Sequence, residues 1–137
     1  MQKTFTILKP DTVKAGNAGA IISRLEKEGF RIRAMKLMHL TKAEAEGFYH
    51  VHKARPFFNS LVAFMTEGPV IMMVLEADNA IEKLRKVMGA TDPAKADPGT
   101  IRKDFATNIE RNAIHGSDAP ETAAFEVSYF FSQIEMV

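Results

Sequence analysis

The chain has 137 residues, of which 46% are hydrophobic and 26% are charged. These values are ordinary for a globular protein and exclude a disordered or collagen-like chain. The length is close to that of one typical domain, so we expect a single domain over residues 1–137. The 18 basic and 17 acidic residues leave a net charge of +1, which gives no reason to expect binding to nucleic acid or to a membrane.

The chain contains no cysteine, which excludes a disulfide framework and a thiolate zinc site. No apolar run approaches the ~18 residues of a membrane span. The first residues, Met1 to Thr4, lack the apolar stretch of a secretory signal. We therefore expect a cytoplasmic protein.

Hydrophobic periodicity predicts a strand, a helix and a second strand in the first part of the chain. Residues 4–8 alternate polar and apolar side chains and end in a turn at Lys9-Pro10-Asp11. Apolar residues then recur at helical spacing over 18–25, and Gly29 stands where a left-handed cap would end that helix. Residues 31–40 resemble a strand whose alternation slips near Met35, which indicates a bulge or a bend.

Two short helices and a buried strand are expected next. Thr41 and Glu44 have the spacing of a capping box, which opens a helix that reaches about His50. A second helix is expected over 56–65. The continuous apolar run over 70–75 is typical of a strand that is covered on both faces.

The last third of the chain is predicted to be a helix, a long loop, a short strand and a final helix. Asp78 is expected to cap the first of these helices. Residues 89–112 show no periodicity, and a loop of that length in a compact domain is usually functional. A short strand near 113–118 follows, and then a helix over 120–131 with Asp118 as its N-cap. Without the two inserted helices, this order is the split β-α-β pattern, an α+β sandwich with an antiparallel sheet.

No glycine-rich phosphate loop of either common type is present, so a nucleotide would have to be held by side chains. Basic residues near predicted element ends or in loops are the candidates, because side chains at such places converge on ligands. They are Lys9, Arg55, Arg85, Arg102 and Arg111. For each one taken alone, a solvated surface charge remains the alternative.

Three of the four histidines have no surroundings that indicate chemistry. His39 lies near a predicted strand end and fits a structural role. His50 and His52 are two residues apart, which places them on different faces of a helix. Because a third ligand is also lacking, a metal site is not expected there.

His115 differs because it stands between the long loop and the last helix and precedes Gly116-Ser117-Asp118. A neutral imidazole offers one nitrogen as a nucleophile when a partner on the other nitrogen fixes its tautomer. Glu126, in the predicted last helix, is a candidate for that partner. A purely structural histidine remains the alternative at this point.

These residues together resemble the nucleoside diphosphate kinase family. The segment Asn112-Ala-Ile-His115-Gly-Ser-Asp118 is similar to that family's active-site signature, Asn-x-x-His-Gly-Ser-Asp. Further similar motifs follow the same order along nearly the whole chain, from residue 4 to about 131. They are Lys9-Pro10-Asp11, Arg55-Pro56-Phe57-Phe58, Gly68-Pro69-Val70 and Asp97-Pro98-Gly99-Thr100-Ile101-Arg102. The chain departs from the pattern at Asp92, where the family often has Asn, and at Ala113, where it has a bulkier aliphatic residue.

The resemblance implies a ferredoxin-like βαββαβ sandwich with a four-stranded antiparallel sheet and a helical hairpin inserted after the second strand. It also implies ping-pong transfer of the γ-phosphoryl group of a nucleoside triphosphate to a nucleoside diphosphate. In that reaction His115 would carry the phosphoryl group, and Glu126 would orient it and accept a hydrogen bond from Ser117. The implied nucleotide-binding residues fall into three groups. Lys9, Tyr49, Arg102 and Asn112 would surround the transferring group and the ribose, Arg55, Arg85 and Thr91 the distal phosphates, and Phe57, Leu61 and Ile109 the base.

By the same resemblance, Mg²⁺ would be held mainly by the nucleotide phosphates and not by a protein cage. The chain would form a homo-oligomer, with dimer, tetramer and hexamer all open, and would tolerate many bases. No specific nucleic acid is expected as a partner. The alternative is a non-catalytic nucleotide-binding or regulatory module on the same fold, since fold alone does not fix function.

Overall fold

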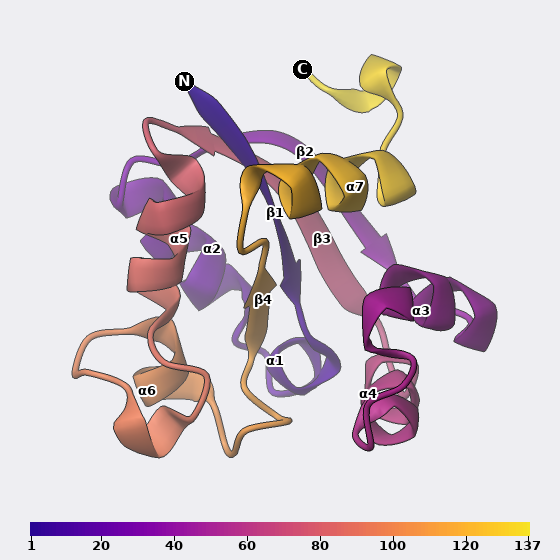
Figure 1. Ribbon diagram of the computed structural model, residues 1–137. Coiled ribbons are helices and arrows are strands. Elements are labelled where there is room, and N and C mark those ends of the chain that lie inside the picture. The colour runs from indigo at the N-terminus through magenta and orange to yellow at the C-terminus, as the bar shows by residue number, and fades with distance from the viewer.

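The computed structural model describes residues 1–137, and its centre is one four-stranded sheet (Figure 1). The strands are β1 (Gln2–Leu8), β2 (Arg31–Met38), β3 (Val70–Ala77) and β4 (Ile114–Gly116). They are arranged in the order β2-β3-β1-β4, and every pair is antiparallel. The expected α+β sandwich of the ferredoxin-like type is confirmed.

Helices cover both faces of this sheet (Figure 1). The seven α-helices are α1 (Pro10–Lys14), α2 (Ala18–Lys27), α3 (Lys42–Phe48), α4 (Phe58–Met65), α5 (Ala80–Met88), α6 (Ile101–Phe105) and α7 (Pro120–Phe130). Three 3-10 turns complete the set: η1 (His50–His52), η2 (Pro93–Lys95) and η3 (Gln133–Glu135). The α3–α4 hairpin follows β2, as expected. None of the helices combines the length and the apolar character that crossing a membrane requires.

Two apolar cores lie on opposite faces of the sheet, because successive residues of a strand point to opposite sides. Phe5 and Ile7 of β1 pack with α3, α4 and α7. Leu8 packs with α2 and α5. On β3, Met72 and Met73 divide between the two cores in the same way, which confirms that the apolar run over 70–75 is covered on both faces.

Several element ends differ from the sequence predictions. The turn expected at Lys9-Pro10-Asp11 opens the short helix α1, which Pro10 begins. The register shift in β2 falls between Ile32 and Ala34 and not at Met35. Gly29 has a φ of 95° just after α2, as predicted, and the capping box of Thr41 and Glu44 is present.

Neither of the two aspartates predicted as helix N-caps holds that position, because each helix has the next residue as its N-cap. Asn79, not Asp78, precedes α5, and it makes no side-chain capping bond. Ala119, not Asp118, precedes α7. Asp118 instead accepts a hydrogen bond from Thr122 Oγ1 at 2.6 Å.

The segment 89–112 was predicted to be a loop, and that prediction is wrong in part because the segment contains η2 and α6. Asp92 caps the 3-10 turn, and Thr100 caps α6 by accepting a hydrogen bond from the Lys103 N–H. Ile101 is fully buried and anchors the segment in the core. Elements of three and five residues are too short to show a helical period, so pattern analysis could not detect them.

Candidate active site

A pocket of about 580 Å³ lies beside β4, which runs between the segment that carries α6 and the α3–α4 hairpin (Figure 1). Strands, helices and loops far apart in the sequence all contribute to its wall. The predicted site residues that line it are Lys9, Tyr49, Phe57, Leu61, Arg85, Thr91, Arg102, Ile109, Asn112, His115 and Glu126. The structure therefore brings most of the predicted set into one place.

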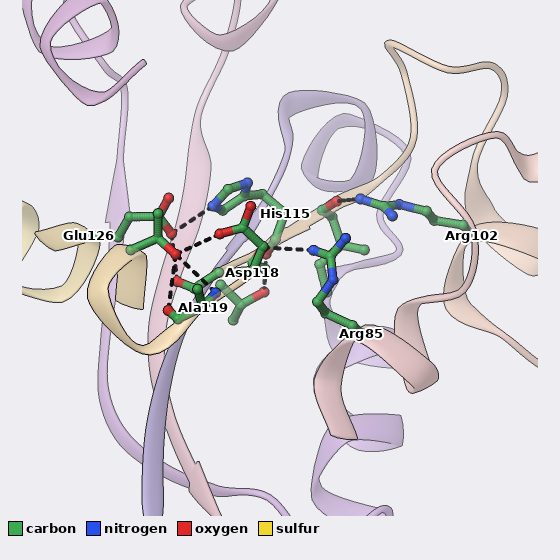
Figure 2. A network of polar contacts seen from close by, with 11 residues as sticks. Arg85, Arg102, His115, Asp118, Ala119 and Glu126 are labelled. Atoms are coloured by element: carbon green, nitrogen blue, oxygen red, sulfur yellow. Dashed lines mark hydrogen bonds and ion pairs between the residues drawn. The ribbon is translucent and has the colours of Figure 1, made fainter. Parts of the chain in front are cut away.

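His115 is the middle residue of β4, where it pairs with Ile7 of the central strand β1. Its Nε2 atom lies 2.8 Å from Oε1 of Glu126 on α7 (Figure 2). Ser117 donates a hydrogen bond from Oγ to the same oxygen at 2.6 Å. A carboxylate held in this way fixes the tautomer with a proton on Nε2, which leaves the lone pair of Nδ1 for chemistry.

Aromatic rings surround the imidazole on its protein side. The ring centroids of Phe5, Phe48 and Tyr49 lie 6.3, 5.5 and 6.4 Å from that of His115, each edge-on. Edge-on contacts of this kind are a favourable arrangement of aromatic rings. Tyr49 is buried, and burial raises the pKa of its phenol, so the hydroxyl stays neutral and available as a hydrogen-bond donor.

Lys9 provides the positive charge at the end of β1. The residue is only 7% exposed, and Nζ donates to Oδ1 of Asn112 at 2.8 Å. Burial and the nearby Arg102 guanidinium lower the pKa of Lys9 to about 8, against the opposing charges of Asp11 and Glu110. A cation buried at this cost is a feature of functional sites.

Arg102 of α6 is anchored by backbone carbonyl groups around the pocket. Its guanidinium donates to the carbonyl oxygens of Ile114 at 2.8 Å, Gly89 at 3.2 Å and Asn112 at 3.3 Å. Burial, and then the charge of Arg85, lowers the pKa of Arg102 to about 10. No carboxylate is bonded to this guanidinium, so its charge remains available to an anion in the pocket.

Arg85 lies on the same side of His115 as Arg102, away from Glu126, and Asp118 lies near His115 between Glu126 and Arg85 (Figure 2). Arg85 of α5 donates to the carbonyl oxygen of Gly116 at 3.4 Å. The hydrogen bond from Thr122, supported by the charge of Arg85, keeps the pKa of Asp118 below its usual value. The pocket is therefore lined by three cations, Lys9, Arg85 and Arg102, and by two carboxylates that contact neither His115 nor Ser117, those of Asp118 and Glu110. This arrangement is suited to a polyphosphate and its counter-ion.

The outer end of the pocket is apolar. Phe57, Leu61 and Ile109 line it, and Phe57 and Ile109 are 46% and 60% exposed. Two contacts tie the Ile109 loop to α4 and to the residues just after it. Ser60 donates to Glu110 at 2.6 Å, and Arg111 pairs with Glu67 at 2.8 Å. The two apolar walls are thereby held opposite one another.

Two of the predicted basic residues are not brought into the pocket. Arg55 is exposed in the turn before α4 and does not line it. Arg111 faces away, since it pairs with Glu67 and lies 4.7 Å from the ring centroid of Phe64. Of the other histidines, His39 bonds the carbonyl oxygen of Thr66 at 2.8 Å, in keeping with a structural role.

The comparisons with known proteins agree with this geometry. A family model described as nucleoside diphosphate kinase matches residues 2–136. The chain belongs to the nucleoside diphosphate kinase family. It is therefore a phosphotransferase that acts on nucleotides, and members of this family depend on a divalent cation.

Named relatives and solved structures of the family match along the whole chain. A nucleoside diphosphate kinase of Trichlorobacter lovleyi is 60% identical over 137 residues, which is 100% of this chain and 99% of the relative. That of Geobacter sulfurreducens is 58% identical, with 100% of both chains covered. The crystal structure of the Aquifex aeolicus enzyme has 44% identity and a TM-score of 0.97, covering 99% of each chain. The Halobacterium salinarum enzyme, solved in complex with CDP, has 40% identity and a TM-score of 0.95, covering 99% of this chain and 91% of that one.

Sequence reasoning missed several residues that the structure adds to the pocket of this nucleoside diphosphate kinase family member. Asp118 was assigned to a helix cap, although its place at the end of the Asn112–Asp118 signature could have indicated a site role. Glu110 and His52 also line the pocket. Nothing in their local sequence distinguishes them from surface residues, and only the fold brings them here.

The donor groups of the pocket fit a divalent cation that enters with its nucleotide. No group of three His, Asp or Glu side chains is placed to hold a metal ion by itself. Asp118 offers a carboxylate on the pocket wall, whereas Glu126 is engaged with His115 and Ser117. One or two carboxylates together with substrate phosphates are the usual setting for Mg²⁺.

Proposed function

We propose that this chain transfers the γ-phosphoryl group of a nucleoside triphosphate such as ATP to a nucleoside diphosphate in two half-reactions, with His115 as the carrier. The main support is the contact between His115 Nε2 and Glu126 Oε1 at 2.8 Å. It fixes the imidazole and leaves Nδ1 as the nucleophilic nitrogen. A module that only binds nucleotides would need no such orientation of an imidazole.

In the first half-reaction, the Nδ1 lone pair of His115 attacks the γ-phosphorus. The new N–P bond forms as the bond to the β–γ bridging oxygen breaks, and that oxygen leaves on the nucleoside diphosphate with the electron pair. The imidazole keeps its Nε2 proton, and Glu126 stabilises the positive charge that develops on the ring. In the second half-reaction, a terminal phosphate oxygen of another diphosphate attacks the same phosphorus and releases His115.

The cations of the pocket would stabilise the charge of the transferring group. Phosphoryl transfer requires mainly in-line positioning and electrostatic stabilisation of the equatorial oxygens. We assign these roles to Lys9 and Arg102, with Tyr49 and Asn112 as hydrogen-bond partners of the phosphoryl group and the ribose. Arg85, Thr91 and Arg55 are assigned to the distal phosphates. For Arg55 this remains a prediction, since its side chain lies outside the pocket lining.

We propose Mg²⁺ as the divalent cation, bound mainly by the nucleotide phosphates, with Asp118 as the protein carboxylate nearest to it. Such an ion neutralises phosphate charge and orients the chain of phosphates. The nucleoside would lie between Phe57 and Ile109, against Leu61. Stacking on an aromatic ring uses the π-face that all bases share, so broad base tolerance is expected. The CDP complex of the Halobacterium salinarum relative is consistent with this class of ligand.

We further propose that the chain acts as a single domain, works in the cytoplasm with the nucleotide pool, and assembles as a homo-oligomer built from dimers. Support for assembly comes from the edge strand β2. Met35 and Leu37 on this strand are 55% and 66% exposed, and β2 has a strand neighbour on one side only. Light scattering of the purified protein measures the assembly directly.

The function is tested by assaying ATP and GDP as a substrate pair with Mg²⁺. We expect the protein to form GTP and the His115→Ala variant to lose at least about a thousandfold in rate while still binding ADP. His39→Ala is the matched control, because His39 only bonds a backbone carbonyl, and its rate should stay within about twofold. GTP formation by folded His115→Ala would refute the mechanism, and ADP binding by the unmutated protein without any GTP would favour the non-catalytic module.

A further inference from the structure

A strained backbone turn lies directly before the proposed nucleophile. Ala113 has a φ of 74° and is one of only two non-glycine residues with a positive φ. The Ile114 N–H donates to the carbonyl oxygen of Asn112 at 2.9 Å, which closes a γ-turn with Ala113 at its centre. A γ-turn with a positive central φ is rare and strained for an L-residue. Such strain persists only when neighbouring groups hold it.

Helix α1 and the residue before it supply the groups that hold this turn. The carbonyl oxygen of Ala113 accepts two hydrogen bonds, from the Lys9 N–H at 2.9 Å and from Thr12 Oγ1 at 2.9 Å. The N–H of Ala113 has a single partner, Oδ2 of Asp11 at 3.1 Å. Because Ala113 is fully buried, removing the Asp11 acceptor would leave its N–H without a protein partner.

The γ-turn at Ala113 sets the position of Asn112, which precedes it, relative to His115, which follows it. Asn112, on its first side, accepts the hydrogen bond from Lys9 Nζ. Ile114, on its other side, begins β4, where it pairs with Leu8 and sets the register that places His115. Asn112, Lys9 and His115 all line the same pocket. A change in the backbone at Ala113 would therefore move the Lys9–Asn112 pair relative to the imidazole.

We propose that Asp11 is a positioning residue for phosphoryl transfer, which acts by holding the Ala113 N–H and thus the γ-turn that aligns Asn112 with His115. Asp11 does not line the nucleotide pocket, so it acts through the backbone and not on the substrate. This inference rests on the proposed role of His115. The family resemblance includes Asp11 in the motif Lys9-Pro10-Asp11 but assigns it no role in the reaction.

The charge of Asp11 has a second consequence for the same site. Its Oδ1 is buried without a hydrogen-bond partner, and the negative charge of the carboxylate acts on the Lys9 ammonium electrostatically. Four groups face or influence the Lys9 ammonium: the Asn112 amide oxygen, the Arg102 guanidinium, and the carboxylates of Asp11 and Glu110. Asp11 and Glu110 favour the protonated Lys9, and Arg102 opposes it.

The test compares Asp11→Ala, Ala113→Gly and the double variant with the unmutated protein. The rate of phosphoryl transfer from Mg·ATP to the enzyme is measured in a single turnover. The KM for ATP and the melting temperature are measured as well. We expect Asp11→Ala to lose about tenfold or more in rate, since small displacements of reacting groups have large effects, with a KM within about threefold. Glycine adopts a positive φ without strain, so Ala113→Gly should restore most of the rate in the Asp11→Ala background.

Each outcome decides the matter. A folded Asp11→Ala variant that reacts within twofold of the unmutated protein, or that Ala113→Gly fails to rescue, overturns the inference. If Asp11→Ala does not fold, Asp11→Asn and Asp11→Glu replace it. Asparagine keeps an acceptor at the same reach and should retain more rate than glutamate, which keeps the charge but displaces the acceptor; the reverse order overturns the inference. Turnover by His115→Ala would instead refute the proposed function, independently of Asp11.

Discussion

Glu126 on helix α7 and His115 on strand β4 are in direct contact, with Oε1 of the glutamate 2.8 Å from Nε2 of the histidine. His115 is fixed by the pairing of β4 with β1, and Glu126 by the packing of α7 on the same sheet, where it is 8% exposed. The direction of the nucleophile is therefore a property of the whole sandwich and not of a loop.

Replacing Glu126 by glutamine tests the contribution of its charge. Glutamine keeps an oxygen that accepts from His115 Nε2 but removes the negative charge opposite the ring. A charge-assisted hydrogen bond is worth roughly twice a neutral one, so kcat should fall about tenfold with little change in KM. Ser117→Ala should cost less, and the double variant less than the product of the two losses, because Ser117 acts through the same oxygen. Independent, multiplicative losses would contradict this coupling.

The pH dependence should report the charge of Lys9. Its pKa in the free protein is lowered to about 8, so above that pH a growing fraction is neutral and no longer stabilises phosphate charge. We expect kcat/KM for the nucleotide to fall about tenfold per pH unit from about pH 8 upward. The kcat profile should fall only at higher pH, because bound phosphates favour the protonated lysine. A kcat/KM that stays flat from pH 7 to 10 would exclude Lys9 as the titrating cation.

The sequence predicted which residues gather at the pocket better than it predicted the short elements that carry them. Lys9, Asn112 and His115 lie in the motifs, and Glu126 was predicted as the partner of His115; the structure brings all four to one pocket. Helix α6 was missed, although it carries Arg102, because a five-residue helix has no measurable period and depends on burial of Ile101.

Other differences arise from tertiary contacts that no local pattern encodes. Asp118 satisfies the local rule for an N-cap, yet it bonds Thr122 Oγ1 and lies beside the pocket, because the chain enters α7 from β4. Arg55 and Arg111 were equal candidates by their positions alone, and the resemblance assigned a role only to Arg55. Only the fold shows that Arg111 is used against Glu67 and Phe64 and that Arg55 lies outside the pocket lining.

The aromatic wall of the pocket should contribute to nucleotide affinity without base preference. Phe57→Ala removes the stacking surface, which is worth about 1–3 kcal/mol per base, so the Kd for ADP and for CDP should both rise by about fivefold or more. Phe125→Ala is the matched control, since Phe125 is similarly exposed, at 37%, but packs against His50 and Tyr129 outside the pocket. Equal effects of the two substitutions in a nucleotide titration would contradict the placement of the base.

A side chain at Gly116 should lower the stability of the fold because helix α5 packs directly on this residue. A Cβ added there would lie 2.6 Å from Met88 Sδ and 3.0 Å from Leu84 Cδ2, so Gly116→Ala should lower the free energy of unfolding by about 1–3 kcal/mol. Gly19→Ala is the control. Nothing lies within 4 Å of a Cβ at Gly19, and alanine favours the α2 helix, so a small gain of about 0.5 kcal/mol is expected. Chemical denaturation measures both, and similar effects would contradict the packing.

Intact-protein mass after brief incubation with Mg·ATP tests the central claim most directly. The sample is kept at neutral or alkaline pH, because phosphohistidine hydrolyses in acid. The account predicts one added phosphoryl group, absent from His115→Ala, which excess GDP removes as GTP appears. An unmodified mass from folded protein, with no GTP formed, or an adduct that persists in His115→Ala, would contradict it.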